Sequence, residues 1–531
     1  MPDFFIPFSP ERSNADCRNK EVYLAASAGQ NYLYILFPRA FRTALPTPGW
    51  RVYSRSVRKL FFHLVALGVL AWPASAQQAD ATGENSRAFP VGTIVPKVAA
   101  LAKPEQSYAL YLPSQYSLGK LWPIVYAFDP GARGKMPVEL MKDAAERYGY
   151  IVVGSNNSRN GSWKIEAEAA QAMLLDTQER LAIDVHRAYF AGFSGGARVA
   201  ARLAQLCKCA AGVLLNGAGF QPEDAGSPDR TVAVFAAAGT YDFNYAEIVR
   251  TDDDLEKSGY PHFLRRFDGP HQWATANAME EALAWFRLQA MKSGSEARDD
   301  SFIAAQAAQE TERARTLDQS GDLYSAWKEY LQAAEMLDGL TDNAALRDRA
   351  GVLEKDKAIR EGAKREKQGF EEQEQLTREI DAGLSTLQEN RETRGDIRAQ
   401  LQRQIVALRG STEHEKREDR LLVLKRALAG ILGAAMDMGI ARLDQKDVHG
   451  ARDYFELACD ANPDSVWVLS NIAVVRAMDG DKKGMLEALR HARAKTQDSA
   501  KFSAWLNEEA AFAKLRGTPE FDALLEAAPQ H

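Results

Sequence analysis

The pentapeptide Gly192-Phe193-Ser194-Gly195-Gly196 is the part of the sequence best suited to chemistry. It ends the apolar run RAYFAGF and opens the helix-like run GGARVAARLAQL. A G-x-S-x-G pattern between a strand and a helix is typical of a nucleophile elbow, in which the serine adopts a strained backbone conformation. Glycines flank it because side chains there would collide with neighbouring backbone. The pattern therefore predicts Ser194 as a nucleophile, with the N–H of Gly195 directed at a developing oxyanion.

An activated serine needs a base, and the base needs a carboxylate that orients it. In such sites the order along the chain is serine, acid, histidine, each after the end of a strand. The run TVAVFAAAGTYDFNY is a strand followed by a loop with Asp242, and HFLRRFDGPHQW is a strand followed by a Gly-Pro turn and His271. We predict Asp242 as the acid and His271 as the base.

The other histidines and carboxylates of this segment are less well placed. His186 precedes the nucleophile strand, and His262 lies at the start of a strand, which is the wrong edge of the sheet. Asp252, Asp253 and Asp254 are alternatives for the acid. They lie in a polar, helix-like run, where a solvated face is expected.

A second oxyanion donor is expected from the loop after the strand WPIVYAF, which reads Asp129-Pro130-Gly131-Ala132-Arg133-Gly134. Because proline has no N–H, Gly131 or Ala132 has to serve. We predict the amides of Gly195 and Gly131 as the oxyanion hole. Arg133 is a candidate both for contact with an acidic substrate group and for a surface salt bridge.

These residues are carried by a segment in which short apolar runs alternate with helix-like stretches. The strand-like runs are SYALYL, WPIVYAF, GYIVVGS, RAYFAGF, AGVLLNG, TVAVFAAAG and HFLRRFDG, and the helix-like stretches include PVELMKDAAERYG, KIEAEAAQAMLLDTQERL and ARVAARLAQLCKCA. Nearly continuous apolar strands between amphipathic helices indicate a mostly parallel sheet covered on both faces. We therefore predict a doubly wound α/β domain over residues 97–290.

No convincing strand follows from about Asp300 onward, and the composition there is typical of helices. Apolar residues repeat at spacings of four, four and three on either side of the polar break ENRETRGD: Leu376, Ile380, Leu384 and Leu387 before it, and Ile397, Leu401, Ile405 and Leu408 after it. Two matched amphipathic helices about a turn predict an antiparallel helical hairpin within a helical region of residues 300–430.

Residues 431–531 carry a repeat. Small and bulky residues have the spacing of a tetratricopeptide repeat (TPR) at Gly439, Ala451, Phe455, Ala458 and Pro463, and Ala492 follows Ala458 by the 34-residue period. The same internal spacing occurs at Gly321, Asp322, Ala326, Tyr330 and Ala333. Small residues let paired helices approach closely, and the aromatic fills the gap between units. Unrelated alanine-rich helices are the alternative.

A three-part leader precedes these regions. RSVRKLFFHLVALGVLAWPASAQQ has a basic head, an apolar core and the small-residue ending Ala74-Ser75-Ala76, which is the layout of a secretory signal peptide. A membrane anchor is the alternative, but the apolar run is short for a span. We interpret residues 51–76 as the signal peptide and 77–96 as a linker. Residues 1–50 are then an over-extended reading frame or a genuine extension.

The bulk composition excludes some classes of protein. At 531 residues the chain is longer than one core usually holds, and 46% hydrophobic and 26% charged residues are ordinary for soluble domains. The net charge of −6 lacks the basic bias of a nucleic-acid binder. Behind the leader, Cys207, Cys209 and Cys459 remain, an odd number that is no disulfide framework. We expect the CKC pair to be buried small hydrophobes on a helix rather than a metal or redox pair.

From about Lys97 to Leu288 the sequence resembles the α/β-hydrolase superfamily, and is most similar there to secreted esterases of the dienelactone hydrolase and polyhydroxybutyrate-depolymerase type. The matching text is YALYLPSQY, WPIVYAFDPGARG, IDVHRAYFAGFSGGA, GTYDFNY and FDGPHQW. The resemblance implies Ser194 as nucleophile, Asp242 as acid and His271 as base, with no metal or organic cofactor. The chain departs from it at Asp129-Pro130-Gly131, where such esterases commonly have His-Gly. The C-terminal part resembles TPR proteins, and AFAKLRGTPEFDALL resembles the segment that often closes such repeats.

The sequence therefore predicts a periplasmic or extracellular serine hydrolase that cleaves small-molecule or polymeric carboxylic esters. No membrane span is expected after signal cleavage, and the TPR-like region is expected to bind a protein partner. Two alternatives stay open. A peptidase or acyltransferase would use the same triad. A scaffold whose hydrolase domain only binds is suggested by the unusual Asp-Pro-Gly loop.

Overall fold

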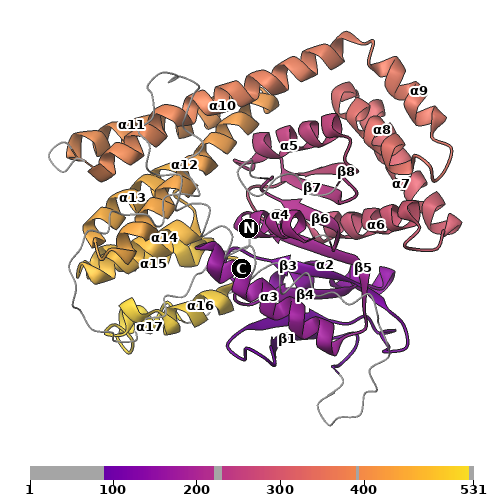
Figure 1. The fold of residues 1–531 in the computed structure, drawn as a ribbon. Coiled ribbons are helices and arrows are strands. Elements are labelled where there is room, and N and C mark those ends of the chain that lie inside the picture. The colour runs from indigo at the N-terminus through magenta and orange to yellow at the C-terminus, as the bar shows by residue number, and fades with distance from the viewer. Residues whose placement is uncertain (1–88, 208, 221–229, 390–393, 526–531) are drawn as a thin grey trace, which may run out of the picture.

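The computed structural model describes residues 89–207, 209–220, 230–389 and 394–525 (Figure 1). The predicted N-terminal extension, the signal peptide and most of the predicted linker lie outside the described residues.

An eight-stranded sheet forms the α/β part, with the strand order β1-β2-β4-β3-β5-β6-β7-β8. The strands are β1 (Ile94–Ala99), β2 (Ser107–Tyr111), β3 (Trp122–Phe128), β4 (Ile151–Ser155), β5 (Ile183–Phe193), β6 (Ala210–Asn216), β7 (Ala233–Gly239) and β8 (His262–Phe267). The pairs β1–β2 and β2–β4 are antiparallel, and the other neighbours are parallel. Every residue of β2, β3, β4 and β7 is buried, which explains why these strands are mostly apolar.

Helices cover both faces of this sheet. The helices are α2 (Lys135–Tyr148), α3 (Trp163–Arg180), α4 (Gly195–Leu206), α5 (Tyr245–Ser258) and α6 (Ala276–Ser293). Helices α2 and α6 share one buried cluster with the sheet, while α3 and α4 share another on the opposite face. The structure thus confirms the predicted mostly parallel, doubly wound α/β sheet followed by an all-helical region. Strand β1, at the edge of the sheet, begins inside the predicted linker. Its run IVPKVA contains a proline, a residue that weakens a strand signal but is tolerated at an edge.

The described chain after the α/β part is helical and arches over the sheet, from its right-hand side in Figure 1 across the top to its left-hand side. Its elements are α7 (Asp300–Ser320), α8 (Leu323–Leu337), α9 (Ala344–Leu353), α10 (Lys357–Glu389), α11 (Arg394–His414), α12 (Glu418–Asp444), α13 (Val448–Ala461), α14 (Val466–Met478), α15 (Lys482–Lys495), α16 (Ser499–Glu508), η2 (Ala510–Phe512) and α17 (Pro519–Asp522). None of the described helices is long and apolar enough to cross a membrane.

Apolar residues from the two halves of the predicted hairpin lie in one core. Ile380, Leu384 and Leu387 of α10 share a buried cluster with Leu401, Ile405 and Leu408 of α11. Farther along, α12 and α13 approach closely, since a Cβ on Gly439 would lie 2.3 Å from Cε1 of Phe455. This contact pairs a small residue with an aromatic, as the repeat spacing requires. The assignment to the TPR family stays a prediction.

The expectation for the CKC cysteines was wrong. Cys207 follows the last residue of α4, with an extended backbone, and it forms a disulfide with Cys209. Helix α4 ends at Leu206, one residue before Cys207 and three residues before Cys209, so neither cysteine lies on the helix as predicted.

A buried cluster of charges joins the sheet to the first helices of the helical region. The guanidinium of Arg265 in β8 pairs with Glu281 of α6, Glu310 of α7 and Glu329 of α8. Its Nη2 donates to Glu310 at 2.8 Å, and Nη1 donates to Glu329 at 3.0 Å. Only 2% of Arg265 is exposed. Arg313 of α7 also pairs with Glu281 and Glu310, so two arginines neutralise this cluster, and Arg265 is the one that connects it to the sheet.

The Arg265→Met variant is expected to lose about 3–5 kcal/mol of unfolding free energy, because it leaves three buried or half-buried carboxylates with Arg313 as their remaining cation. Urea unfolding followed by circular dichroism measures this loss. Arg315→Ala, which breaks the exposed Arg315–Glu312 pair on α7, is the matched control and should change stability little. Equal stability of the Arg265→Met variant and the wild type would contradict the assigned role.

Candidate active site

Ser194 lies on a sharp turn between β5 and α4. Its backbone angles are φ 53° and ψ −120°, a conformation that non-glycine residues rarely adopt. The turn is held by neighbouring backbone: Ser194 N–H donates to the carbonyl of Asn216 at the end of β6 (2.8 Å), and the Ser194 carbonyl accepts from Ala197 N–H (3.0 Å). This is the geometry of a nucleophile elbow, with the hydroxyl held above the end of the strand.

The two flanking glycines are required by close backbone approaches. A Cβ on Gly192 would lie 2.0 Å from the carbonyl oxygen of Gly196, and a Cβ on Gly196 would lie 2.0 Å from the carbonyl oxygen of Phe128 in β3. Both obstacles are backbone atoms that cannot rotate away. The sequence pattern thus reflects a physical requirement of this turn.

The loops after β7 and β8 lie against each other and bring Asp242 and His271 together. Tyr241 N–H donates to the Gly269 carbonyl at 3.1 Å. A Cβ on Gly239 would lie 2.4 Å from the same oxygen, so the last residue of β7 has to be small. Because β7 and β8 are parallel, their carboxyl ends emerge at the same edge of the sheet as that of β5.

The predicted serine, histidine and aspartate form one hydrogen-bonded series. His271 Nε2 lies 2.8 Å from Ser194 Oγ, and His271 Nδ1 lies 2.9 Å from both carboxylate oxygens of Asp242. Asp242 has no exposed surface, whereas 9% of Ser194 and 16% of the His271 side chain are exposed. With the Nδ1 proton donated to the carboxylate, Nε2 is free to accept the serine proton.

The His271 ring and its loop are fixed by neighbours that the sequence analysis missed. The ring lies between Phe193 and Phe243, with centroids 4.7 and 4.2 Å away. The buried Asn216 side chain donates to the Gln272 carbonyl (3.3 Å) and accepts from Ala274 N–H (2.6 Å). Asn216 therefore ties the nucleophile turn to the histidine loop. The sequence feature that could have indicated the role of Asn216 is its position as a polar residue near the end of the apolar run AGVLLNG.

The predicted oxyanion loop is arranged differently from expectation. Gly131 N–H donates to Oδ1 of Asp129 at 2.8 Å, and Ala132 N–H donates to the Asp129 carbonyl at 3.1 Å. The fully buried Asp129 carboxylate also accepts from Arg133 (2.7 and 2.8 Å) and from the Trp273 indole (2.7 Å). The amide of Gly131 is thus engaged within its own loop, and a role in oxyanion binding requires its release. Arg133 forms an ion pair with Asp129 inside the loop.

Gly195, the other predicted donor, opens α4 and has the Asn160 side chain directly over it. A Cβ on Gly195 would lie 1.9 Å from Asn160 Oδ1. Asn160 is positioned by its own N–H, which donates to the Pro130 carbonyl at 2.9 Å, and by the bridge between Arg159 and Gly131. The loop after β4 therefore forms one wall beside Ser194.

The alternative acids and bases do not join this series. Asp252 of α5 lies 3.6 Å from the ring of His262, which opens β8. Burial raises the pKa of Asp252 to about 6, partly offset by His262. His186 lies within β5, ahead of the serine. Because β5 and β8 run in the same direction, His186 and His262 in their amino-terminal halves lie away from the edge at which Ser194 lies.

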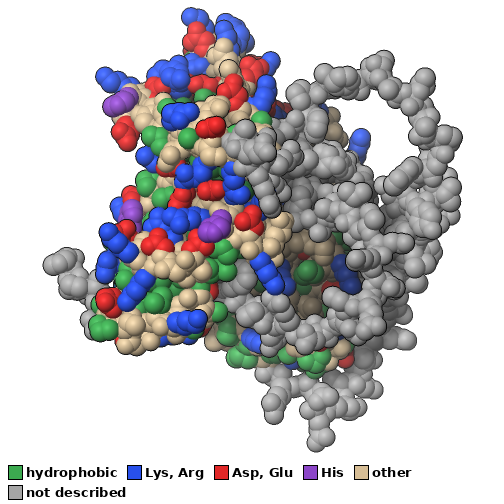
Figure 2. Space-filling view, turned by 90° about the vertical axis from the view of Figure 1, so that its left-hand side faces the viewer, with side chains coloured by type: hydrophobic (Ala, Val, Ile, Leu, Met, Phe, Trp, Pro, Cys, Tyr) green, Lys and Arg blue, Asp and Glu red, His purple; other side chains and the backbone are tan. Residues whose placement is uncertain are grey.

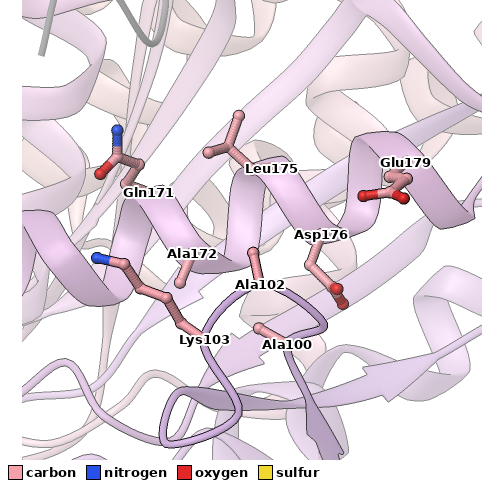
Figure 3. A pocket seen from close by; sticks show the side chains of 8 residues that line it. All are labelled: Ala100, Ala102, Lys103, Gln171, Ala172, Leu175, Asp176 and Glu179. Atoms are coloured by element: carbon pink, nitrogen blue, oxygen red, sulfur yellow. The ribbon is translucent and has the colours of Figure 1, made fainter.

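Neither a metal site nor the small pocket beside α3 adds to the site around Ser194 in the described part of the chain. In that part of the chain, no cluster of three or more His, Cys, Asp or Glu side chains is arranged to hold a metal ion. A small pocket lies between the β1–β2 loop and α3 (Figure 3), and it is lined by Ala100, Ala102, Lys103, Gln171, Ala172, Leu175, Asp176 and Glu179. Asp176 there accepts from the Tyr108 hydroxyl and from Leu101 N–H, which is a structural role.

The Gly196→Ala variant is expected to unfold more readily than wild type or to fail to accumulate, because the added methyl meets the Phe128 carbonyl. Thermal unfolding of the purified protein measures the effect. Gly351→Ala is the control, since Gly351 lies in α9 with open space at its Cβ position, and it should be neutral or stabilising. Wild-type stability of the Gly196→Ala variant would show that the turn tolerates a side chain.

Comparisons with known proteins give only distant likenesses. No family model matches the chain, and no curated protein matches it. Among solved structures, a fluorophosphonate-binding serine hydrolase of Staphylococcus aureus is 12% identical, with a TM-score of 0.31, and the match covers 37% of this chain and 99% of that one. A hyperthermophilic esterase of Pyrobaculum calidifontis is 15% identical (TM-score 0.30; 45% and 93% covered). The feruloyl esterase module of Clostridium thermocellum is 19% identical (TM-score 0.31; 36% and 86% covered). Identities and TM-scores of this size say nothing about the activity of this chain.

Proposed function

We propose that this protein is a serine hydrolase that cleaves carboxylic esters through an acyl-enzyme intermediate. One observation carries the proposal: the Ser194 hydroxyl, on a strained strand-to-helix turn, lies 2.8 Å from an imidazole whose other nitrogen lies 2.9 Å from a fully buried carboxylate. A buried carboxylate and a strained serine both cost stability, and they occur together where function requires them.

The proposed reaction has two halves. Ser194 Oγ attacks the ester carbonyl carbon while His271 Nε2 takes the serine proton, and the tetrahedral anion lies against Gly195 N–H. The imidazolium then returns that proton to the leaving alcohol as the carbon–oxygen bond breaks. Water repeats the sequence on the acyl-serine, which releases the carboxylic acid and restores the hydroxyl. Asp242 fixes the ring tautomer and stabilises the imidazolium throughout.

Two alternatives use the same residues. A peptidase or acyltransferase differs only in the leaving group or the final acceptor, so substrate comparison has to distinguish them. The engaged Gly131 amide favours a second class, a binding scaffold with an intact triad but a weak oxyanion hole. Covalent labelling separates this scaffold from an active hydrolase.

We expect a fluorophosphonate probe to label the wild-type protein and to leave Ser194→Ala unlabelled, because the probe reacts with an activated serine hydroxyl. Hydrolysis of p-nitrophenyl esters of increasing chain length, beside a peptide substrate set, then identifies the acyl class. Ser295→Ala serves as the control for loss of a hydroxyl outside the site. Folded wild-type protein that takes no label, or labelled Ser194→Ala, would remove the support for acyl transfer.

We further propose that the protein is exported and that its helical region binds a protein partner. The Cys207–Cys209 disulfide supports an oxidising compartment. Figure 2 shows the molecule from the side of the helical region, where basic and acidic side chains are interspersed on the described surface.

Protein recovered from cells should begin at Gln77, as N-terminal sequencing would show. Cross-linking in the intact compartment should join a second protein to residues 300–525. A mature chain that retains the leader contradicts export.

A further inference from the structure

The loop that carries Asp242 is held from outside the α/β part. Arg426 of α12 donates from Nε to the Thr240 carbonyl at 2.7 Å, and Gln373 of α10 donates from Nε2 to the Phe243 carbonyl at 2.9 Å. These carbonyls lie on either side of Asp242. Two helices from a distant part of the sequence therefore hold the backbone on both sides of the predicted acid.

Helix α12 also packs against Phe243, whose ring contacts that of His271. Phe243 lies 4.2 Å from the His271 ring, measured between centroids. On its other side are two glycines of α12: a Cβ on Gly430 would lie 3.5 Å from the Phe243 Cβ, and a Cβ on Gly433 would lie 3.8 Å from its Cε1. Both distances are ordinary van der Waals contacts, so α12 packs directly against Phe243. Phe243 is thereby held between α12 and His271.

Arg426 itself is fixed by a buried polar network. Only 7% of the residue is exposed, and its guanidinium stacks on the Tyr245 ring at 3.8 Å. The Tyr245 hydroxyl accepts from Arg266 of β8 (3.1 Å) and donates to Glu366 of α10 (3.3 Å). Burial lowers the pKa of Arg426, and the nearby Glu366 and Asp242 carboxylates oppose that effect.

Glu366 links this network to a third helix. It accepts from the Tyr324 hydroxyl (2.8 Å) and from the Lys328 ammonium (3.2 Å), both on α8. Burial raises the pKa of Glu366, but Lys328 and Arg266 outweigh it and hold that pKa below its ordinary value. The carboxylate thus stays ionised between the cations. The network therefore restricts movement of the Arg426 side chain away from the Thr240 carbonyl.

We propose that Arg426 and Gln373 are positioning residues of the active site, and that the helical region is a working part of the hydrolase because it fixes Asp242 against His271. This inference rests on the proposed function. Helix α12 also runs unbroken to Asp444 and packs on α13. A partner that shifts α13 would therefore shift α12 and, with it, the loop that carries Asp242.

The test uses the full exported chain and p-nitrophenyl acetate. Arg426→Met removes the donor and the charge while it keeps most of the side-chain length, and it is expected to lower kcat by about 10- to 100-fold with KM within about twofold of wild type. Gln373→Leu should act in the same direction. Arg426→Lys keeps a cation and a donor, and should recover much of the lost kcat.

Arg420→Ala is the matched control. Arg420 lies on the same helix and pairs with Glu372 and Glu415, but it is exposed and does not touch the acid loop, so kcat should stay near wild type. Thermal unfolding of each variant accounts for general loss of structure. The inference is overturned if Arg426→Met keeps wild-type kcat, or if Arg420→Ala loses as much activity as Arg426→Met.

Hydrogen–deuterium exchange gives a readout independent of activity. The peptide that contains residues 239–245 should exchange faster in Arg426→Met than in wild type and Arg420→Ala, since its carbonyl anchor is lost. Unchanged exchange there contradicts the positioning role even if the protein proves to have no esterase activity. If the wild type proves inactive but the loop exchanges faster in Arg426→Met, the proposed function is rejected. The positioning of the loop by Arg426 is then still supported.

Discussion

Asp242 carries a carboxylate with no exposed surface, and the arrangement of the site follows from that constraint. A buried carboxylate has to be hydrogen-bonded, because water no longer solvates it. Here His271 Nδ1 and the Asn244 N–H (2.8 Å) are its partners. The loops after β7 and β8 must therefore stay in register, and the Gly239–Gly269 contact keeps them so. The packing of α10 and α12 outside them also excludes solvent from the carboxylate.

The second constraint is the strain at Ser194. A non-glycine residue at φ 53° persists only where the surroundings prevent relaxation. Three strands contribute to this: β3 through the Phe128 carbonyl near Gly196, β5 through its end, and β6 through the Asn216 carbonyl. Since Asn216 also holds the histidine loop with its side chain, a single residue relates the position of Ser194 to that of His271.

The Asp129 loop is held in place by its own side chains. An acidic residue at this position attracts Arg133, the Trp273 indole and the Gly131 amide, so the loop is closed on itself by charge-assisted hydrogen bonds. The same interactions bind the loop after β3 to the loop of the base, through Trp273. Asn160, over Gly195, is the polar side chain that the structure places nearest to the elbow glycine.

Local sterics and periodicity in the sequence determined the strands β2–β8 and the turn at Ser194, because each depends on residues close together in the chain. The all-helical character after residue 300 was predictable for the same reason. Only the tertiary structure decided the partner of the Gly131 amide, the Cys207–Cys209 disulfide, the edge strand β1 and the role of Asn216. The contacts of Arg426 and Gln373 join residues 186 and 130 positions apart, and no local pattern specifies which carbonyl a distant side chain will meet. Such pairings arise only when the helices have packed, because burial then forces each polar group to find a partner.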